Sequence, residues 1–272
     1  GLLFQQAGRP KESEIELNTA IAMFDKKLGP NNLEAAQCTS DLALLLLSQN
    51  KDKRAIALLE SVVGIFEKKL GPEDLQVATA IGELGTAYAH AGRFKEAEEQ
   101  ARKALALYRK KLPADSLAIA VTLSNIGSRL KSQGKFNEAL DYYTQSLAIQ
   151  DKKLGANSID SLVNLNGIVS AYVNSGDYKK AEPLLRKALL IKEKQFGPKN
   201  VGTVSALKNL ASCLQLEGVR TAEPGNLLTR AEDILVSVPL TKRKFVDNFI
   251  SHELIEGLDL KARRARKKDE VW

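Results

Sequence analysis

Two histidines, His90 and His252, and two cysteines, Cys38 and Cys213, are the side chains best suited to catalysis or metal binding in this chain. Catalytic and metal sites need such groups to converge, and zinc sites usually take their ligands at short, regular spacings. Here these residues are scattered over different segments, and no glycine-rich phosphate-binding loop occurs. The sequence therefore predicts a protein that is not an enzyme and that needs no metal or cofactor.

The cysteines also bear on the cellular compartment. Cys38 and Cys213 lie near opposite ends of the sequence, so we expect no disulfide between them within one chain. A reducing compartment, such as the cytoplasm, is the simpler interpretation. No apolar stretch reaches the roughly 20 residues that cross a bilayer, so no membrane span is predicted.

Positive charge is the second chemical feature, with a formal net charge of +7 and a pI near 9.2. The predicted basic surface comprises paired lysines and a basic C-terminal run: Lys110, Lys111, Lys152, Lys153, Arg263, Arg264, Arg266, Lys267 and Lys268. The pairs suit helix C-termini and solubility, and contact with an acidic partner or RNA is the alternative. The basic run has three interpretations: a solvated helix end, a localisation signal, or an arm reaching an acidic surface.

An internal repeat predicts the elements that carry these residues. The phrase Gly92-Arg-Phe-Lys-Glu-Ala97 returns as Gly134-Lys-Phe-Asn-Glu-Ala139 and as Gly176-Asp-Tyr-Lys-Lys-Ala181, at a spacing of 42 residues. The phrase Lys-Leu-Gly-Pro at 27–30 and 69–72, and Lys-Leu-Gly-Ala at 153–156, fall in the same register. Repetition at a fixed period predicts an array in which each repeat is one structural unit.

Each unit is predicted to form two antiparallel helices. In residues 75–91 the apolar side chains recur at spacings of three and four, which marks one stripe along a helix that Gly92 ends. A second helix, about 94–112, turns the small side chains of Ala97, Ala101 and Ala104 inward. Because such a pair cannot bury its stripes alone, neighbouring pairs must stack. The predicted fold is all-α, a right-handed α-solenoid, or superhelix, of antiparallel helix pairs.

The phrase Leu84-Gly85-x-x-Tyr88 followed by Ala97 resembles the tetratricopeptide repeat signature. The period of 42, with the Gly-Arg-Phe-x-Glu-Ala and Lys-x-Leu-Gly-Pro phrases, is similar to the kinesin light chain type of this repeat. The resemblance covers about residues 1–235. It implies a protein-interaction fold in which the first helix of every pair lines a concave groove.

The resemblance places small polar side chains along that groove. The predicted peptide-binding residues are Ser124, Asn125, Ser128, Asn166, Ser170, Asn174, Lys208, Asn209, Ser212 and Gln215. Earlier units place Asp41, Leu44, Thr79, Gly82, Glu83, Thr86 and His90 at equivalent positions. The family's asparagine ladder is matched at Asn125 and Asn209 but not at Asp41, Glu83 or Gly167, so we expect the C-terminal half to dominate binding. A merely solvated helix face is the alternative.

The two ends of the chain depart from the repeat. Gly1 aligns with Gly85, so we expect the chain to begin inside a truncated first unit, and a targeting signal before Gly1 stays open. The predicted solenoid covers residues 1–238, with four full units and a sixth that carries an insertion near 219–226. Residues 239–260, with Phe245, Phe249 and Leu258, are predicted to form a capping helix. Residues 261–272 are predicted to form a basic tail.

The leading functional hypothesis is a non-catalytic protein–protein interaction scaffold. Its groove would bind an extended peptide or a helix of a partner protein. The alternative is a structural subunit of a large assembly, which contacts protein or RNA through the lysine pairs and the basic C-terminal tail.

Overall fold

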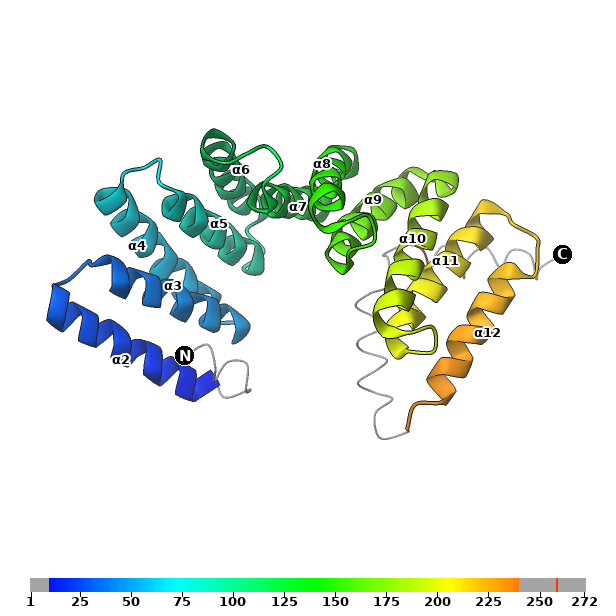
Figure 1. Cartoon of the computed structure of the whole chain (residues 1–272), viewed down its shortest axis with the longest axis horizontal. Helices are drawn as coiled ribbons and strands as arrows, with labels where there is room; N and C mark the ends of the chain where they lie inside the picture. The colour runs from blue at the N-terminus through cyan, green and yellow to red at the C-terminus, as the bar shows by residue number, and fades with distance from the viewer. Residues whose placement is uncertain (1–9, 240–257, 259–272) are drawn as a thin grey trace. The chain divides into compact units, whose positions relative to one another are not determined.

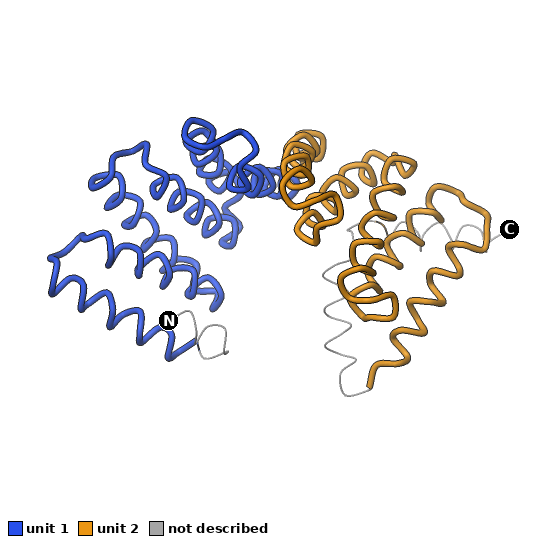
Figure 2. Tube along the Cα trace, viewed as in Figure 1, with its two compact units in different colours: residues 1–133 blue, residues 134–272 orange. Residues whose placement is uncertain are grey.

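The computed structural model describes residues 10–239 and Leu258. The chain divides into two compact units, residues 1–133 and 134–272 (Figures 1 and 2). Unit 1 contains α2 (Pro10–Leu28), α3 (Leu33–Ser48), α4 (Asp52–Leu70), α5 (Leu75–His90), α6 (Phe94–Lys111) and α7 (Leu117–Ser132). Unit 2 contains α8 (Phe136–Leu154), η1 (Ile159–Ser161), α9 (Leu162–Ser175), α10 (Tyr178–Phe196), η2 (Val201–Thr203), α11 (Val204–Glu217) and α12 (Glu223–Val236). The described part of the chain holds helices and no strand, so the prediction of an all-α fold is confirmed.

Consecutive helices pack against each other inside each unit. In unit 1 the contacts run from α2 to α7 in chain order, and in unit 2 they run from α8 to α9 and from α9 through α12. The helices predicted at 75–91 and 94–112 are confirmed as α5 and α6, with ends that differ by at most one residue. Handedness of the superhelix stays a prediction. In each pair we call the earlier helix the first helix: α3, α5 and α7 in unit 1, and α9 and α11 in unit 2.

Side-chain caps start the first helices of unit 1. The Asn32 side chain accepts from the Ala35 amide at 2.7 Å, and Asp74 accepts from the Gln76 amide at 2.7 Å. Ser116 caps α7 in the same way. Each cap satisfies one of the amide groups that have no partner in the first turn of a helix, and each follows a turn that ends the preceding helix.

The turn between the two helices of a pair needs a left-handed residue. Gly92 has φ +73°, and the next amide, that of Arg93, donates to the Tyr88 carbonyl at 2.8 Å. This bond closes the C-terminus of α5 and turns the chain directly into α6. The predicted role of Gly92 is therefore confirmed.

Alanines form the contact between the helices of a pair. Ala97 on α6 is fully buried, and so is Ala104, about two turns further along the same helix. Ala181 on α10 and Ala231 on α12 are also fully buried. On α5, a Cβ added at Gly85 would lie 3.2 Å from the Ala97 carbonyl oxygen. Small side chains thus let the two backbones approach closely, as the sequence predicts.

Unit 2 adds polar groups to its core. The Asn164 side chain on α9 is fully buried and donates to Ser146 at 2.9 Å and to Gln150 at 2.8 Å, both on α8. Gly167 also faces α8, and a Cβ there would come within 2.4 Å of the Tyr143 ring. Gly167 therefore serves helix packing, which explains why no asparagine stands at this position.

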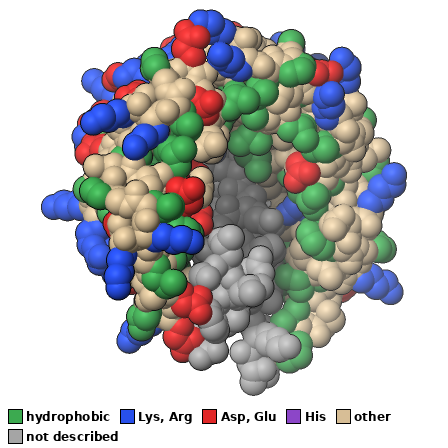
Figure 3. All heavy atoms as spheres, turned by 60° about the vertical axis from the view of Figure 1, so that its left-hand side comes forward, with side chains coloured by type: hydrophobic (Ala, Val, Ile, Leu, Met, Phe, Trp, Pro, Cys, Tyr) green, Lys and Arg blue, Asp and Glu red, His purple; other side chains and the backbone are tan. Residues whose placement is uncertain are grey.

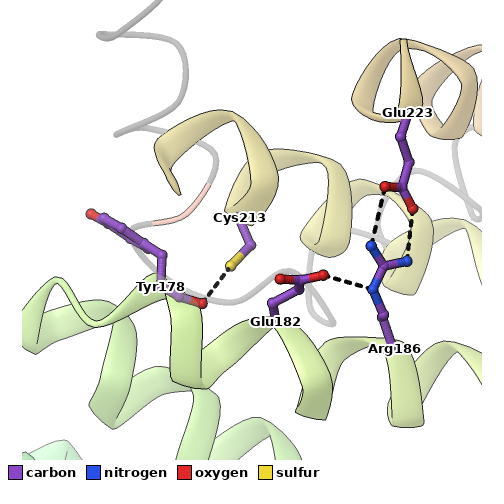
Figure 4. Close-up of polar contacts among 5 residues, drawn as sticks. All are labelled: Tyr178, Glu182, Arg186, Cys213 and Glu223. Atoms are coloured by element: carbon purple, nitrogen blue, oxygen red, sulfur yellow. Dashed lines mark hydrogen bonds and ion pairs between the residues drawn. The ribbon is translucent and has the colours of Figure 1, made fainter. Parts of the chain in front are cut away.

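An ion-pair cluster attaches the last described helix. Arg186 on α10 donates to Glu182 on its own helix at 2.8 Å and to both carboxylate oxygens of Glu223 at 2.7 and 3.1 Å (Figure 4). Glu223 is the first residue of α12 and Pro224 follows it in the first turn, where a missing amide is tolerated. Part of the segment near 219–226, where an insertion is predicted, is therefore helical.

The predicted capping helix at 239–260 and the basic tail at 261–272 lie outside the described residues, apart from Pro239 and Leu258. Leu258 is 1% exposed and belongs to an apolar cluster with residues of α9, α10 and α11, including Val173, Leu185 and Leu210. The cap and the tail stay predictions.

Ala139→Leu tests the packing of α8. Ala139 on α8 is 1% exposed, so a larger side chain should overpack the core and lower the free energy of unfolding by about 1–3 kcal/mol. Ala148→Leu, on the exposed face of the same helix, is the matched control and should change stability little. Thermal or urea unfolding measures both. Equal effects of the two substitutions would show that Ala139 does not lie in a tightly packed part of the core.

Candidate functional site

The first helices of unit 1 frame an open hollow of about 400 Å³, which we call the unit 1 hollow. It is lined by Leu44 on α3, by four residues of α5, by Tyr108 on α6 and by five residues of α7: Leu44, Thr79, Gly82, Glu83, Thr86, Tyr108, Leu117, Ala118, Val121, Thr122 and Asn125. Most of these α3 and α5 residues are the groove positions that the sequence assigns to the second and third units. The hollow therefore lies on the face predicted to bind a partner.

Apolar side chains form one side of the hollow. Leu117 and Val121 are one turn apart on α7 and remain 39% and 53% exposed. Opposite them, Gly82 on α5 has no side chain, and a Cβ added there would meet no atom within 4 Å. Gly82 therefore adds no side chain to the hollow, although glycine in the middle of a helix costs roughly 1 kcal/mol relative to alanine.

A carboxylate lies beside this apolar surface. Glu83 on α5 is half-buried and accepts a hydrogen bond from the Ser40 hydroxyl on α3. Burial raises the pKa of Glu83 above its usual value, the Ser40 hydrogen bond lowers it, and the nearby Asp41 charge raises it further. The pKa of Asp41 is also raised, because desolvation outweighs the opposite effect of its hydrogen bond with Gln37. Within the described residues, no lysine or arginine side chain lies where it would offset the negative charge of Glu83.

Of the predicted peptide-binding residues, three lie on α7 in unit 1. Asn125 lines the unit 1 hollow and is half-buried, and Ser124 and Ser128 are half-buried on the same helix. The remaining hollow residues, above all Glu83, Leu117 and Val121, are missing from the predicted set. Glu83 is one of the predicted groove positions, but it does not match the family's asparagine ladder and so is not among the predicted peptide-binding residues.

The other predicted residues lie in unit 2, on α9 and α11. Asn166, Lys208 and Gln215 are half-buried, Asn174 is exposed and donates to the Ser170 carbonyl at 2.9 Å, and Ser170, Asn209 and Ser212 are buried. With Asn209 and Ser212 only 4% and 6% exposed, a partner reaches them only after a rearrangement. The structure thus leaves part of the predicted C-terminal site inaccessible, and its role in binding stays a prediction.

The predicted lysine surface is partly neutralised by acidic neighbours. Lys110 forms an ion pair with Glu73, and Lys111 lies 3.9 Å from the same carboxylate. Glu73 has a lowered pKa because of the Lys110 hydrogen bond and charge. Lys152 and Lys153 end α8 and also have interaction partners. Figure 3 shows Lys and Arg side chains interspersed with Asp and Glu over the face it draws. Arg263, Arg264, Arg266, Lys267 and Lys268 lie outside the described residues.

The thiols and the described histidine do not form a reactive centre. Cys213 is fully buried against the Tyr178 carbonyl, and burial raises its pKa to about 12, so it stays a protonated, unreactive thiol (Figure 4). His90 pairs with Asp52 at 3.1 Å on the surface. Within residues 10–239, no group of His, Cys, Asp and Glu side chains converges in a way that could hold a metal ion.

A family model of the tetratricopeptide repeat matches residues 1–68, 53–110, 76–152 and 160–220 of this chain. The chain belongs to the tetratricopeptide repeat family. Proteins of this family generally act as non-catalytic scaffolds for protein–protein interaction, so the resemblance seen in the sequence is confirmed at the level of the family. A search of curated proteins found no match to this tetratricopeptide repeat chain.

Solved structures give the type of repeat. The repeats of a putative kinesin light chain from Podosopora anserina share 25% identity with this chain, cover 75% of it and 96% of their own chain, and have a TM-score of 0.66. BtubC (BKLC) from P. vanneervenii has 18% identity, covers 84% of this chain and 91% of its own, and has a TM-score of 0.72. YrrB, described as a tetratricopeptide repeat protein with an unusual peptide-binding site, has 18% identity, covers 80% and 93%, and has a TM-score of 0.53. The chain is therefore similar to kinesin light chain-like repeat proteins.

No helix among the described residues combines the length and the apolar character that a membrane crossing requires.

Glu83→Gln tests the electrostatics of the hollow. Because the folded pKa of Glu83 is raised, the folded state holds the proton more tightly than the unfolded chain. Stability from the neutral carboxyl is fully present below the unfolded pKa and is lost as pH rises through the folded pKa. Glu83→Gln should therefore raise the melting temperature at about pH 7 and change it little near about pH 4, where the carboxyl is protonated.

Glu99→Gln is the control for this measurement. Glu99 is exposed on α6 and pairs with Lys103 at 2.8 Å, so its removal should change stability slightly at neutral pH. A lower melting temperature of Glu83→Gln at neutral pH would show that the Glu83 charge stabilises the fold.

Proposed function

We propose that this chain is a non-catalytic scaffold that binds an extended peptide or a helix of a partner protein on the face of its first helices. The observation that carries the proposal is the unit 1 hollow, which combines exposed apolar side chains with hydroxyl, amide and carboxylate groups on three successive first helices. YrrB, whose fold is similar, is described as having a peptide-binding site, which supports a role of this kind.

The chemistry of the hollow suits a polypeptide ligand. Leu117 and Val121 offer apolar surface that a partner side chain can cover. Asn125 offers an amide that can both donate to and accept from a peptide backbone. Apolar contact with a few oriented polar groups is the usual composition of a peptide-binding groove.

Photo-crosslinking identifies the partner. A photoreactive amino acid is placed at Val121, in the hollow, or at Lys111, on the predicted lysine surface, and the chain is irradiated in an extract of its source cells. We expect a protein to be captured from Val121. Capture of protein or RNA from Lys111 alone would favour the alternative, a structural subunit that uses its basic surface.

Gly82→Leu then tests whether the captured partner occupies the hollow. The new side chain meets no protein atom at its Cβ and replaces a helical glycine, so stability should stay equal or rise by up to about 1 kcal/mol. It fills the hollow, however, and should weaken the partner's affinity at least about tenfold. Gly64→Leu is the matched control, because Gly64 is also helical with no atom within 4 Å of an added Cβ. Equal affinity of the two variants, measured by calorimetry, would refute the proposal.

Asn125→Ala combined with Asn166→Ala tests the predicted peptide-binding residues. Both side chains are half-buried, so the fold should tolerate their loss, whereas partner groups that they satisfy would be left unpaired. At about 1–3 kcal/mol for each such group, affinity for the captured partner should fall by roughly ten- to a thousand-fold. Lys110→Glu with Lys111→Glu should leave the same affinity nearly unchanged. If the lysine pair matters and the asparagine pair does not, binding takes place on the basic surface.

A further inference from the structure

We infer that the unit 1 hollow recognises a protein segment that carries an aliphatic side chain next to a lysine or arginine, with the aliphatic group between Gly82 and Val121 and the cation on Glu83. This inference rests on the proposed function and adds the chemistry of the partner. It is carried by the apolar hollow and by the charge beside it.

The apolar half of the inference comes from the shape of the hollow. Leu44, Leu117, Ala118 and Val121 line the hollow together with Gly82, where an added Cβ would meet no atom within 4 Å. Exposed leucine and valine side chains gain free energy when a partner removes them from water. The lining contains one aromatic side chain, Tyr108, whose hydroxyl is hydrogen-bonded to Thr79 at 2.9 Å. This mostly aliphatic lining fits an aliphatic side chain of a partner.

The charged half comes from Glu83. Its carboxylate is half-buried at the edge of the apolar surface, one turn from Thr86 and next to Gly82 on α5. Ser40 supplies one hydrogen bond, Asp41 adds a second negative charge nearby, and the described side chains supply no cation. A half-buried carboxylate without a cationic neighbour favours a positively charged partner, and an arginine or lysine can complete its hydrogen bonds.

The same charges exclude other partners. An acidic segment placed in the hollow would bring a third carboxylate near Glu83 and Asp41, and like charges that lose water repel strongly. The unit 1 hollow is therefore selective for basic segments, although the chain as a whole is basic. The net charge of +7 alone would suggest the opposite selectivity.

Selection from a library of short random peptides tests the inference on the full chain. Enriched peptides should contain Leu, Ile, Val or Met close to Lys or Arg, and their affinity is measured by fluorescence anisotropy. Glu83→Gln should weaken these peptides at least about tenfold, whereas Glu99→Gln, the same change on an exposed face, should leave affinity within about twofold. Replacing the peptide's basic residue by norleucine should weaken binding to the unaltered chain and have little further effect on Glu83→Gln.

Gly82→Leu separates this inference from the proposed function. If peptides are weakened by Gly82→Leu but not by Glu83→Gln, or if the enriched peptides lack basic residues, the face binds peptides and the inferred chemistry is wrong. If neither substitution weakens any enriched peptide, or no peptide is enriched, both the inference and the unit 1 hollow as a binding site are overturned.

Discussion

Alanine occupies the contact between the helices of each pair, and the close approach that it permits governs the rest of the structure. Ala97, Ala181 and Ala231 are fully buried, and on α5 a Cβ added at Gly85 would lie 3.2 Å from the Ala97 carbonyl oxygen. A larger side chain at such a contact would push the helices apart and open the core beneath them. Because the pairs are held at this short distance, each first helix presents a fixed row of side chains on the opposite face.

That fixed row explains how a destabilising group is retained in unit 1. Glu83 is held half-buried by the packing of α3 and α5, and desolvation raises its pKa. Gly82, beside it, weakens the helix that carries both residues. We therefore expect neither residue to improve the stability of the fold, and groups of this kind concentrate at binding sites, where a ligand compensates for them. A half-buried carboxylate at Glu83 and a glycine inside the helix at Gly82 are both unfavourable for folding, and their adjacency therefore supports a common role in binding.

Unit 2 uses its polar residues differently. Asn164 is enclosed by Ser146 and Gln150, and Lys192 is buried with its ammonium group 2.9 Å from the Ser205 hydroxyl. Polar contacts of this kind constrain how α8 packs against α9 and how α10 packs against α11, because an unpaired buried group would cost free energy. In unit 2 a Ser or Asn on a first helix is therefore more often buried than exposed, and the composition of the helix does not distinguish the two.

The sequence by itself determined the repeat, the helix pairs, the turn at Gly92 and the family, because these depend on local periodicity and on backbone preferences that recur in every unit. It also identified the face on which Glu83 and Asn125 lie, since helical spacing fixes which residues share a side. Only the tertiary structure decided which of those residues are accessible. Asn209 is buried, Gly167 makes room for Tyr143, and Glu83 lies in an open hollow, although all three have equivalent positions in the repeat. Accessibility depends on the size and position of side chains from neighbouring helices, and a one-dimensional repeat does not contain that information.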